Sequence, residues 1–496
     1  MNVVVVLIDS LNRHLLRAYG DSSVATPNVD RLARRAWRFD NHFVGSLPCM
    51  PARRELLAGR REMLWRAWGP LEPYDPRLPD LLRAAGSTTA AVTDHYHYWE
   101  ESGNGYLQSF DSTAMIRGHE IDFWRAPLAD GAPLPRWARN IARWRPEGAR
   151  RYYANVRDFR GEEDFFPARV MREAVRWLDA YDGERPFYLH VESFDVHEPF
   201  HVPEPYASMY GPPPDAVDFT VWPPYQRADE LAAFMRATSE EELAFIRAQY
   251  AGKLTMVDRW LGELLDALDR HRLWDDTAVV LTTDHGHDLG EHGAFGKQFP
   301  HRDTHANIPL LVWNPRAPGE GRSVAALTST VDVFSTVLEL AGAQVPPCDG
   351  HSLVGLMERG AAPSRDALLY GAFGTGACAT DGEWTIIKAP RTDGPLYSYS
   401  TQLFRSLLAD ELCAPDAHGH FIPDVRYPQW RTPVTLTENK PLSFEDLLLR
   451  RDDEGAGNRW ASEPRQRRRM LDLLRELVDA EGAPPEQYER LGLTPR

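Results

Sequence analysis

Acidic and histidine side chains follow several short apolar runs of this sequence, at the points where the predicted strands end. Four runs are followed in this way: Val3–Ile8 by Asp9, Thr88–Thr93 by Asp94 and His95, Phe187–Val191 by Asp195 and His197, and Ala278–Thr283 by Asp284 and His285. Open parallel sheets bind ligands outside the carboxyl ends of their strands. Because four separate strands would deliver such side chains to one edge, the sequence predicts a chemically active site there.

Asp9, Asp284 and His285 form a predicted site for one divalent metal ion. Carboxylate oxygens bind hard cations such as Mg²⁺ and Ca²⁺, and an imidazole nitrogen also suits Mn²⁺ and Zn²⁺. Each residue alone has a simpler explanation, because aspartate is common where a strand ends and Asp284-His285-Gly286 is compatible with a tight turn. The set as a whole favours a metal site over unrelated turns.

The elements that would position these residues alternate between strand and helix. The candidate strands, rich in β-branched or aromatic residues, are Val3–Ile8, Thr88–Thr93, Phe187–Val191, Ala278–Thr283 and Ile308–Trp313. The candidate helices between them include Val29–Trp37, Ala168–Tyr181 and Tyr250–Arg270, and residues 51–60 also have a helical pattern. Such alternation predicts an α/β fold with a mostly parallel sheet covered by helices on both faces.

Two segments interrupt the alternation, and a second domain follows it. Residues 112–165 and 199–240 are predicted insertions over the edge of the sheet, where loops shape substrate choice. A boundary is expected near residue 365, which gives a catalytic domain of residues 1–365. Residues 366–496 are predicted to form a smaller α+β domain that finishes with the helix Glu463–Ala480.

The composition disfavours several functional classes. The chain has 496 residues, a formal net charge of −16 and four scattered cysteines. The charge disfavours nucleic acid and anionic membranes as partners, and the cysteines form neither a disulfide framework nor a zinc module. No apolar run approaches the ~20 residues that span a bilayer, and the N-terminus lacks the features of a secretory leader. We therefore expect a cytoplasmic protein without a membrane partner.

Cys49 lies in a motif with a specific resemblance. The motif is Cys49-x-Pro51-x-Arg53, followed by Leu57-x-Gly59-Arg60. It resembles the site at which the formylglycine-dependent sulfatases oxidise a cysteine to an aldehyde. Further sulfatase-like segments occur in the same order, namely Thr26–Leu32, Thr283–Gly286, Gly290–Gly293 and Lys297. The resemblance implies an alkaline-phosphatase-like fold, one divalent metal ion and a formylglycine-generating enzyme that acts on the unfolded Cys49 segment.

The resemblance also implies a role for each matching residue. Cys49 would become the hydrated aldehyde that attacks the substrate and contacts the metal held by Asp9, Asp284 and His285. Arg53 would hold and orient this aldehyde, and Lys297 would bind the anionic oxygens of the substrate. His197 would donate a proton to the leaving oxygen. The developing negative charge would be spread over the metal, Lys297 and Arg53.

The sequence departs from the common sulfatase pattern at three places. Asp9 is followed by Ser10 where many sulfatases have a second aspartate, and Asp284 is followed by His285 where asparagine is commoner. This combination is similar to the phosphonate monoester hydrolases and phosphodiesterases of the same group. After the second strand, the lysine of a Gly-Lys-x-His segment is absent.

Four further residues are candidates near the substrate. His95 or His97 could act as the base that collapses the intermediate, and Tyr96 could donate to a substrate oxygen. A histidine- and tyrosine-rich strand end that packs against a loop explains the same residues. His305 could face the site from beyond Lys297. The basic stretch Arg145–Arg160 is compatible with a solvated helix face or with a source of positive potential for an anionic substrate.

The leading hypothesis is a metal-dependent hydrolase that cleaves sulfate esters of small anionic substrates. A phosphonate monoester hydrolase or phosphodiesterase is the alternative within the same superfamily, because both transition states present anionic oxygens to the same residues. An inactive relative that binds anions through an unmodified Cys49 is the alternative from another class. A homo-oligomer is compatible with the sequence.

Overall fold

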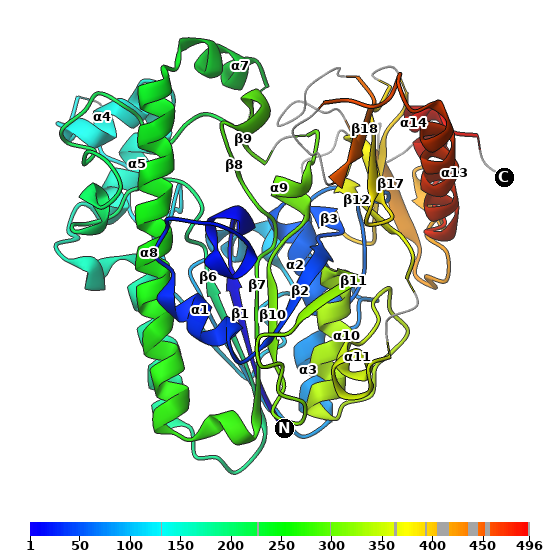
Figure 1. Cartoon of the computed structure of the whole chain (residues 1–496), viewed down its shortest axis with the longest axis horizontal. Helices are drawn as coiled ribbons and strands as arrows, with labels where there is room; N and C mark the ends of the chain where they lie inside the picture. Colours follow the sequence, from blue (N-terminus) through cyan, green and yellow to red (C-terminus); the bar gives the residue numbers. More distant parts are fainter. Residues whose placement is uncertain are drawn as a thin grey trace.

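A computed structural model describes residues 1–129, 131–225, 228–297, 299–361, 365–391, 394–403, 416–434, 445–451 and 457–494. Its largest feature is an eight-stranded sheet that runs through the centre of the molecule (Figure 1). The strands in spatial order are β11 (Ser323–Ser329), β2 (Trp37–Phe43), β10 (Leu310–Trp313), β7 (Thr277–Thr282), β1 (Asn2–Ile8), β6 (Phe187–Ser193), β4 (Thr88–Thr93) and β5 (Ser112–Met115). Only β10 runs antiparallel to its neighbours, so the predicted mostly parallel sheet is confirmed.

Helices cover both faces of this sheet, and the residues of β1 show how. Val4, Val6 and Ile8 belong to a core that also contains buried residues of three helices, α1 (Pro27–Ala33), α6 (Phe166–Ala180) and α8 (Glu240–Arg270). Val3, Val5 and Leu7 belong to the opposite core, which contains residues of α2 (Cys49–Ala58), α3 (Leu78–Ala84), α10 (Thr330–Ala341) and α11 (Val354–Arg359). Alternate residues of a strand point to opposite faces, so an all-apolar strand is buried on both sides.

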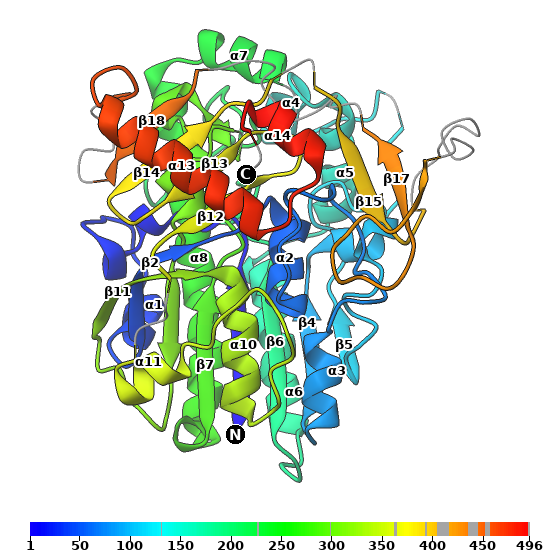
Figure 2. The same cartoon turned by 90° about the vertical axis from the view of Figure 1, so that its right-hand side faces the viewer.

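A second layer of structure lies beyond the carboxyl ends of the central strands. A five-stranded sheet contains β18 (Leu447–Arg450), β14 (Trp384–Lys388), β13 (Ala377–Thr380), β12 (Leu368–Ala372) and β3 (Ser46–Leu47). A three-stranded sheet contains β15 (Tyr397–Ser400), β17 (Gln429–Pro433) and β16 (His418–Gly419). Figure 2 shows α13 (Pro464–Ala480) and α14 (Pro485–Leu491) across this region. Because β3 comes from the first part of the chain, the two sheets are tied together just before Cys49.

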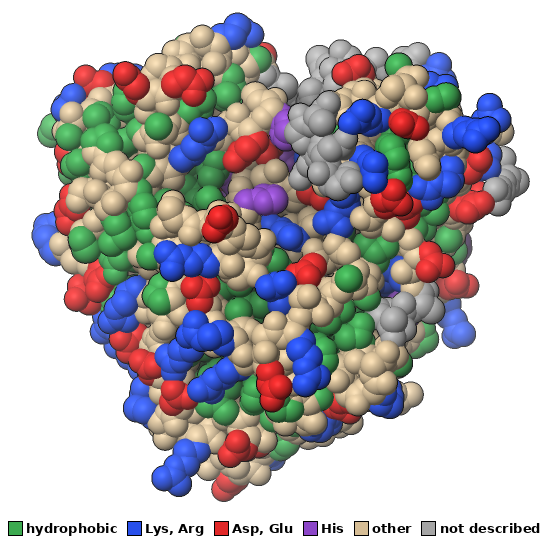
Figure 3. All heavy atoms as spheres, in the orientation of Figure 1, with side chains coloured by type: hydrophobic (Ala, Val, Ile, Leu, Met, Phe, Trp, Pro, Cys, Tyr) green, Lys and Arg blue, Asp and Glu red, His purple; other side chains and the backbone are tan. Residues whose placement is uncertain are grey.

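The predicted insertions also acquire structure. Residues 112–165 begin with β5, an edge strand of the large sheet, and continue into α4 (Arg136–Ala142) and α5 (Pro146–Val156). Residues 199–240 contain α7 (Ala228–Ala237) and end at the start of α8. Figure 3 shows a hollow between this part of the molecule and the second layer, with histidine side chains visible in it. The two parts therefore form opposite walls above the strand ends.

Three sequence expectations need correction. The helix predicted at Val29–Trp37 ends at Ala33, because Trp37–Phe43 alternates between apolar and polar residues and pairs with β10 and β11. The helix predicted to finish the chain is followed by α14. The start of the predicted insertion at residue 112 is a strand of the sheet, paired in parallel with β4. The domain boundary near residue 365 stays a prediction.

No helix within the described residues is both long and apolar enough to cross a membrane.

Buried His42 makes one prediction about stability. It lies on β2 with no exposed surface, and its Nδ1 is 3.0 Å from the Thr328 hydroxyl. Burial lowers the pKa of His42 from 6.5 to about 3. The unfolded chain therefore binds a proton that the folded chain does not bind between these two pH values. The contribution of His42 to folding is present above pH 6.5 and falls by about 1.4 kcal/mol per pH unit as the pH decreases.

The variant His42→Gln should lose less stability than the wild type between neutral and mildly acidic pH. Urea unfolding at several pH values measures this, because each curve gives a free energy of unfolding. His418→Gln is the control, since His418 is exposed on β16. Parallel pH dependence in the wild type and His42→Gln would contradict the explanation.

Candidate active site

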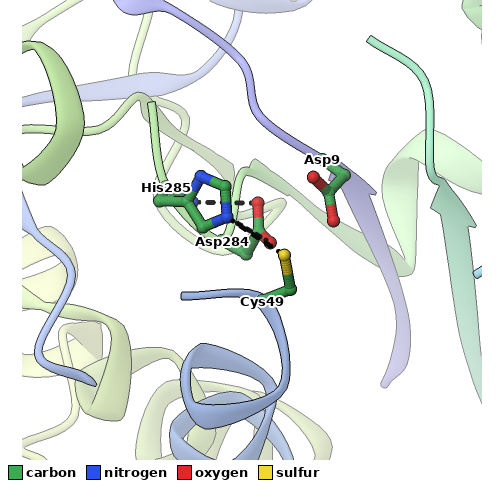
Figure 4. A group of neighbouring side chains, drawn as sticks. All are labelled: Asp9, Cys49, Asp284 and His285. Carbon is green, nitrogen blue, oxygen red and sulfur yellow. Dashed lines mark hydrogen bonds and ion pairs between the residues drawn. The ribbon is translucent and has the colours of Figure 1, made fainter. Parts of the chain in front are cut away.

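Three elements bring the predicted metal-binding residues together. Asp9 directly follows β1, Asp284 and His285 follow the adjacent parallel strand β7, and Cys49 is the first residue of α2. One ligand atom from each of these four residues lies within 4.8 Å of all the others, and every side chain is buried (Figure 4). The Cys49 Sγ is 3.3 Å from the His285 Nε2. The strand ends therefore converge on the start of α2, as the sequence predicts.

Arg53 lies one helical turn after Cys49 and binds the carboxylates of the cluster. It donates from Nη2 to Asp9 at 2.6 Å, from Nη1 to Asp284 at 2.7 Å and from Nε to Glu192 at 2.6 Å. Its Nη1 also donates to the Cys49 carbonyl oxygen at 3.0 Å. Arg53 is fully buried. These contacts favour a role for Arg53 in fixing the metal ligands. None of them is to the side chain of residue 49, which the predicted role in holding the hydrated aldehyde requires.

The charges of the cluster fit a divalent cation. Asp9, Asp284 and Glu192 are three buried carboxylates around a single arginine, Arg53. Burial and the negative charge of Asp284 raise the pKa of Asp9 well above its ordinary value. Burial opposes ionisation of Asp284 as well, but His285 and Arg53 lower its pKa. Two carboxylates and one imidazole facing one point suit Mn²⁺, Ca²⁺, Zn²⁺ or Mg²⁺, and the added charge would relieve the crowding of the acids.

Lys297 and His197 extend the cluster around Cys49. The Lys297 Nζ is 3.1 Å from the Cys49 Sγ and 2.6 Å from the His197 Nε2. Burial opposes the charge on Lys297, but Cys49, Asp9 and Glu198 raise its pKa. Burial and Lys297 lower the pKa of His197 well below its ordinary value. The neutral imidazole donates from Nδ1 to the Glu198 carbonyl oxygen at 3.0 Å, which leaves Nε2 to accept from Lys297.

The comparisons with known proteins agree with this geometry. A family model described as Sulfatase matches residues 1–343. The chain belongs to the sulfatase family. The multifunctional alkaline phosphatase superfamily protein PehA of Trinickia caryophylli is 29% identical to this sulfatase, over 72% of this chain and 77% of that protein. The choline-sulfatase of Rhizobium meliloti strain 1021 is 27% identical, over 71% of this chain and 70% of that protein.

A solved structure shows the same fold. The phosphonate monoester hydrolase of Agrobacterium radiobacter superposes with a TM-score of 0.68 at 22% identity, covering 97% of this chain and 96% of that one. The sequence-based assignments to an alkaline-phosphatase-like α/β fold and to the sulfatase-type hydrolases are therefore confirmed.

The two histidines after β4 differ in their surroundings, and His95 is the one influenced by the charge of Arg53. It is fully buried, its pKa is lowered by burial and by the positive charge of Arg53, and its ring stacks on Phe194. Within the described part of the chain, neither of its ring nitrogens has a hydrogen-bond partner. His97 is instead bound to Glu100, with Nδ1 2.7 Å from the carboxylate. This favours His95 over His97 as the predicted base.

Tyr96 and His305 have contacts that differ from the predicted ones. The Tyr96 hydroxyl donates to Glu120 at 3.0 Å, so the proton expected to reach a substrate oxygen is bound elsewhere. The His305 Nε2 is 3.0 Å from the carbonyl oxygen of Gly296 and 3.1 Å from Asp288. His305 is fully buried and supports the hairpin of β8 (Asp288–Leu289) and β9 (Phe295–Gly296), which carries Lys297. These contacts favour positioning roles for both residues.

The sequence interpretation missed two charged residues of the site. Glu192, which binds Arg53, lies next to the last residue of the predicted strand at Phe187–Val191, so its position at a strand end was an available signal. Lys253 is buried in the predicted helix at Tyr250–Arg270, where a fully buried lysine indicates a specific partner. It donates to the carbonyl oxygens of His197 and Pro199, each at 2.7 Å.

Lys253 should control the position of His197. It also forms an ion pair with the Asp195 Oδ1, and the His119 Nε2 is 2.6 Å from the same oxygen. The variant Lys253→Met removes all three Lys253 contacts and leaves a buried carboxylate short of a partner, which should destabilise the protein by about 3 kcal/mol. Because His197 lies on the released loop, hydrolysis should slow most for esters with poor leaving groups.

Thermal melting and kcat across aryl esters of graded phenol acidity test this prediction. Lys388→Met is a matched control, because Lys388 also forms an ion pair, with Asp446 at 2.9 Å, but lies on the second layer. An equal loss of rate for good and poor leaving groups would show that Lys253 has only a structural role.

Proposed function

We propose that this sulfatase hydrolyses sulfate esters of small molecules with a formylglycine formed from Cys49 and one divalent metal ion. A single observation carries the proposal. The Cys49 Sγ lies within 4.8 Å of a ligand atom from each of Asp9, Asp284 and His285, and it is 3.1 Å from the Lys297 Nζ. A nucleophile at this point would have both a cation site and an ammonium group within contact distance. The start of α2 adds the favourable field of a helix N-terminus.

The residues of the chain divide the reaction between them. A divalent cation held by Asp9, Asp284 and His285 would supply Lewis-acid stabilisation of negative charge on oxygen. Arg53 keeps the two carboxylates in place by donating one hydrogen bond to each of them. Lys297 is placed to bind a non-bridging oxygen of the ester, since its Nζ lies beside residue 49.

Proton transfer is assigned to the pair of Lys297 and His197. In the structure the hydrogen bond runs from the Lys297 Nζ to the His197 Nε2, so the proton destined for a leaving oxygen is shared by both residues. The ring nitrogens of His95 have no hydrogen-bond partner among the described residues, and His95 is the proposed base for the last step, in which the aldehyde is restored and sulfate leaves.

A phosphonate monoester or phosphate diester is the second candidate substrate class. The observation that favours it is Ser10, whose hydroxyl donates to the Asp9 Oδ1 at 2.7 Å where a second aspartate would add a carboxylate. One acidic ligand fewer leaves more net positive charge at the metal. The compartment, the metal bound, the enzyme that converts Cys49 and the oligomeric state stay predictions.

Peptide mass analysis paired with a substrate panel tests the proposal. Conversion of Cys49 should lower the mass of the tryptic peptide of residues 39–53 by about 18 Da, since a thiol is replaced by a carbonyl. The converted protein should hydrolyse para-nitrophenyl sulfate. The ratio of the kcat/KM for this ester to the kcat/KM for para-nitrophenyl phenylphosphonate ranks the two substrate classes. An unconverted peptide in a sample that hydrolyses these esters at full rate would refute the formylglycine mechanism. Converted protein that is loaded with metal and hydrolyses neither ester would refute the proposed activity.

A further inference from the structure

Arg145, the first residue of the basic stretch, faces an aromatic wall of the site. It immediately precedes α5, and its guanidinium carbon lies 4.9 Å from the ring centre of Trp222 and 4.8 Å from that of Tyr225. Arg145 comes from the segment of residues 112–165, and both rings come from the segment of residues 199–240. The two predicted insertions therefore meet at this contact.

Tyr225 connects Arg145 to the reacting groups. The Lys297 Nζ is 5.4 Å from the Tyr225 ring centre, and the His197 ring centre is 6.0 Å from it. Lys297 in turn touches residue 49. Two cations, Lys297 and Arg145, thus lie around one aromatic ring, and only the first belongs to the reaction itself. Since each cation lies within 5.4 Å of the same ring centre, one small leaving group is long enough to contact both.

Arg145 differs from Arg150 and Arg160 of the same stretch in that its guanidinium has no acceptor among the described residues. The guanidinium of Arg150 donates to the Ala129 carbonyl oxygen at 2.9 Å, and that of Arg160 donates to the Arg157 carbonyl oxygen at 3.1 Å. For the Arg145 guanidinium, the described residues provide neither a hydrogen-bond acceptor nor an ion pair, and its Nε is buried. A buried donor without an acceptor is costly, and an acceptor supplied by a ligand would remove this cost.

The carboxylate that accepts the Tyr225 hydroxyl proton does not neutralise Arg145. Glu120 is 2% exposed and accepts the hydroxyl protons of Tyr96 at 3.0 Å and Tyr225 at 3.1 Å, one on each oxygen. It makes no ion pair with Arg145 among the described residues. Arg145 is half-buried, so a ligand reaches it more readily than it reaches Glu120. The charged group that a ligand can reach on this wall is therefore the positive Arg145.

We propose that Arg145 binds a second anionic group, carried by the leaving-group part of the substrate. The inference rests on the proposed function and narrows it to esters with two anionic groups, one held at Lys297 and the other at Arg145. The second group is a carboxylate, sulfate or phosphate, because these offer the paired oxygens that a guanidinium binds. Arg145 is thus a specificity residue outside the bond-breaking machinery.

A matched pair of esters tests the inference. The probes are meta-carboxymethylphenyl sulfate and meta-carbamoylmethylphenyl sulfate, which share shape and differ in one charge, while the methylene keeps their phenol acidities similar. Wild-type kcat/KM should favour the carboxylate by about tenfold or more, as expected for a charge-assisted contact. Arg145→Gln should bring the ratio of the two kcat/KM values close to one, and Arg145→Lys should keep part of the preference for the carboxylate.

Arg151→Gln is the matched control. Arg151 belongs to the same stretch and also stacks on a ring, that of Phe123 at 5.0 Å, but Phe123 is 61% exposed on the surface. This variant should keep the wild-type ratio. The ratio of kcat/KM for the two esters does not depend on how much of a variant is folded or has a converted Cys49, because both esters are assayed with the same protein sample.

The outcomes separate the inference from the proposed function. A wild-type ratio near or below one, with both esters hydrolysed, would overturn the role of Arg145 and leave the hydrolase assignment standing. A high ratio that survives in Arg145→Gln would also overturn it, since another group would then bind the carboxylate. Metal-loaded, converted protein that hydrolyses neither these esters nor the para-nitrophenyl esters would overturn the proposed function and this inference with it.

Discussion

Replacing Cys49 with alanine is expected to reduce ester hydrolysis to background, a loss of at least about 10⁴-fold in kcat, because the variant has no side chain that can be converted to the nucleophile. Folding should change little, since Cys49 is a small buried residue at the first position of α2 and its carbonyl oxygen remains available to Arg53. Metal should still bind, because Asp9, Asp284 and His285 are untouched. Turnover of para-nitrophenyl sulfate, thermal melting and metal analysis measure these three results.

Cys378→Ala is the matched control for this experiment. Cys378 is also fully buried, but it lies on β13 in the five-stranded sheet. Its loss should cost some stability through a small cavity and leave turnover intact. Full activity in Cys49→Ala would show that the nucleophile is elsewhere.

Replacing Asp284 with alanine is expected to remove metal and activity together. The carboxylate is one of two acidic ligands, and its Oδ1 also accepts from the backbone amides of Ser10 at 3.0 Å and His285 at 2.9 Å. Its loss therefore removes a ligand and loosens the residues that follow β1 and β7. We expect metal affinity to fall by at least about a hundredfold, since even outer contacts of metal ligands contribute 10- to 100-fold. Metal analysis after dialysis and turnover in added metal measure the two effects.

Asp258→Ala separates loss of metal from general damage. Asp258 is another buried aspartate, and it accepts from the backbone amides of Asn28 at 3.0 Å and Val29 at 2.7 Å at the start of α1. This variant should be less stable but keep its metal. Stoichiometric metal in Asp284→Ala, with the control behaving in the same way, would argue against Asp284 as a ligand.

The two experiments address different halves of the site. Cys49 and Lys297 are the residues at which bonds would change, while Arg53 and the strand-end acids would hold the cation. Cys49→Ala should keep metal and lose chemistry, and Asp284→Ala should lose both. The difference is expected because Cys49 would supply the nucleophile, whereas Asp284 is one of the candidate metal ligands.

The sequence by itself determined the central strands and the residues at their ends. β4 has the predicted bounds, and β1 and β6 include the whole of the predicted strands. Asp9 and Asp284 could be assigned to one edge because parallel strands place their carboxyl ends together. The Cys49 motif indicated the family without any knowledge of contacts. These features are local, since periodicity and short motifs are set by neighbours along the chain.

Only the tertiary structure decided which side chains meet across long stretches of sequence. It paired Arg53 with Glu192, Lys253 with the loop of His197, and Arg145 with the ring of Tyr225. It also bound Tyr96 to Glu120 and His305 to Gly296, where the sequence suggested substrate contacts. Such pairs join elements far apart in the chain, so they depend on how helices and inserted segments pack over the sheet. No local pattern in the sequence encodes that packing.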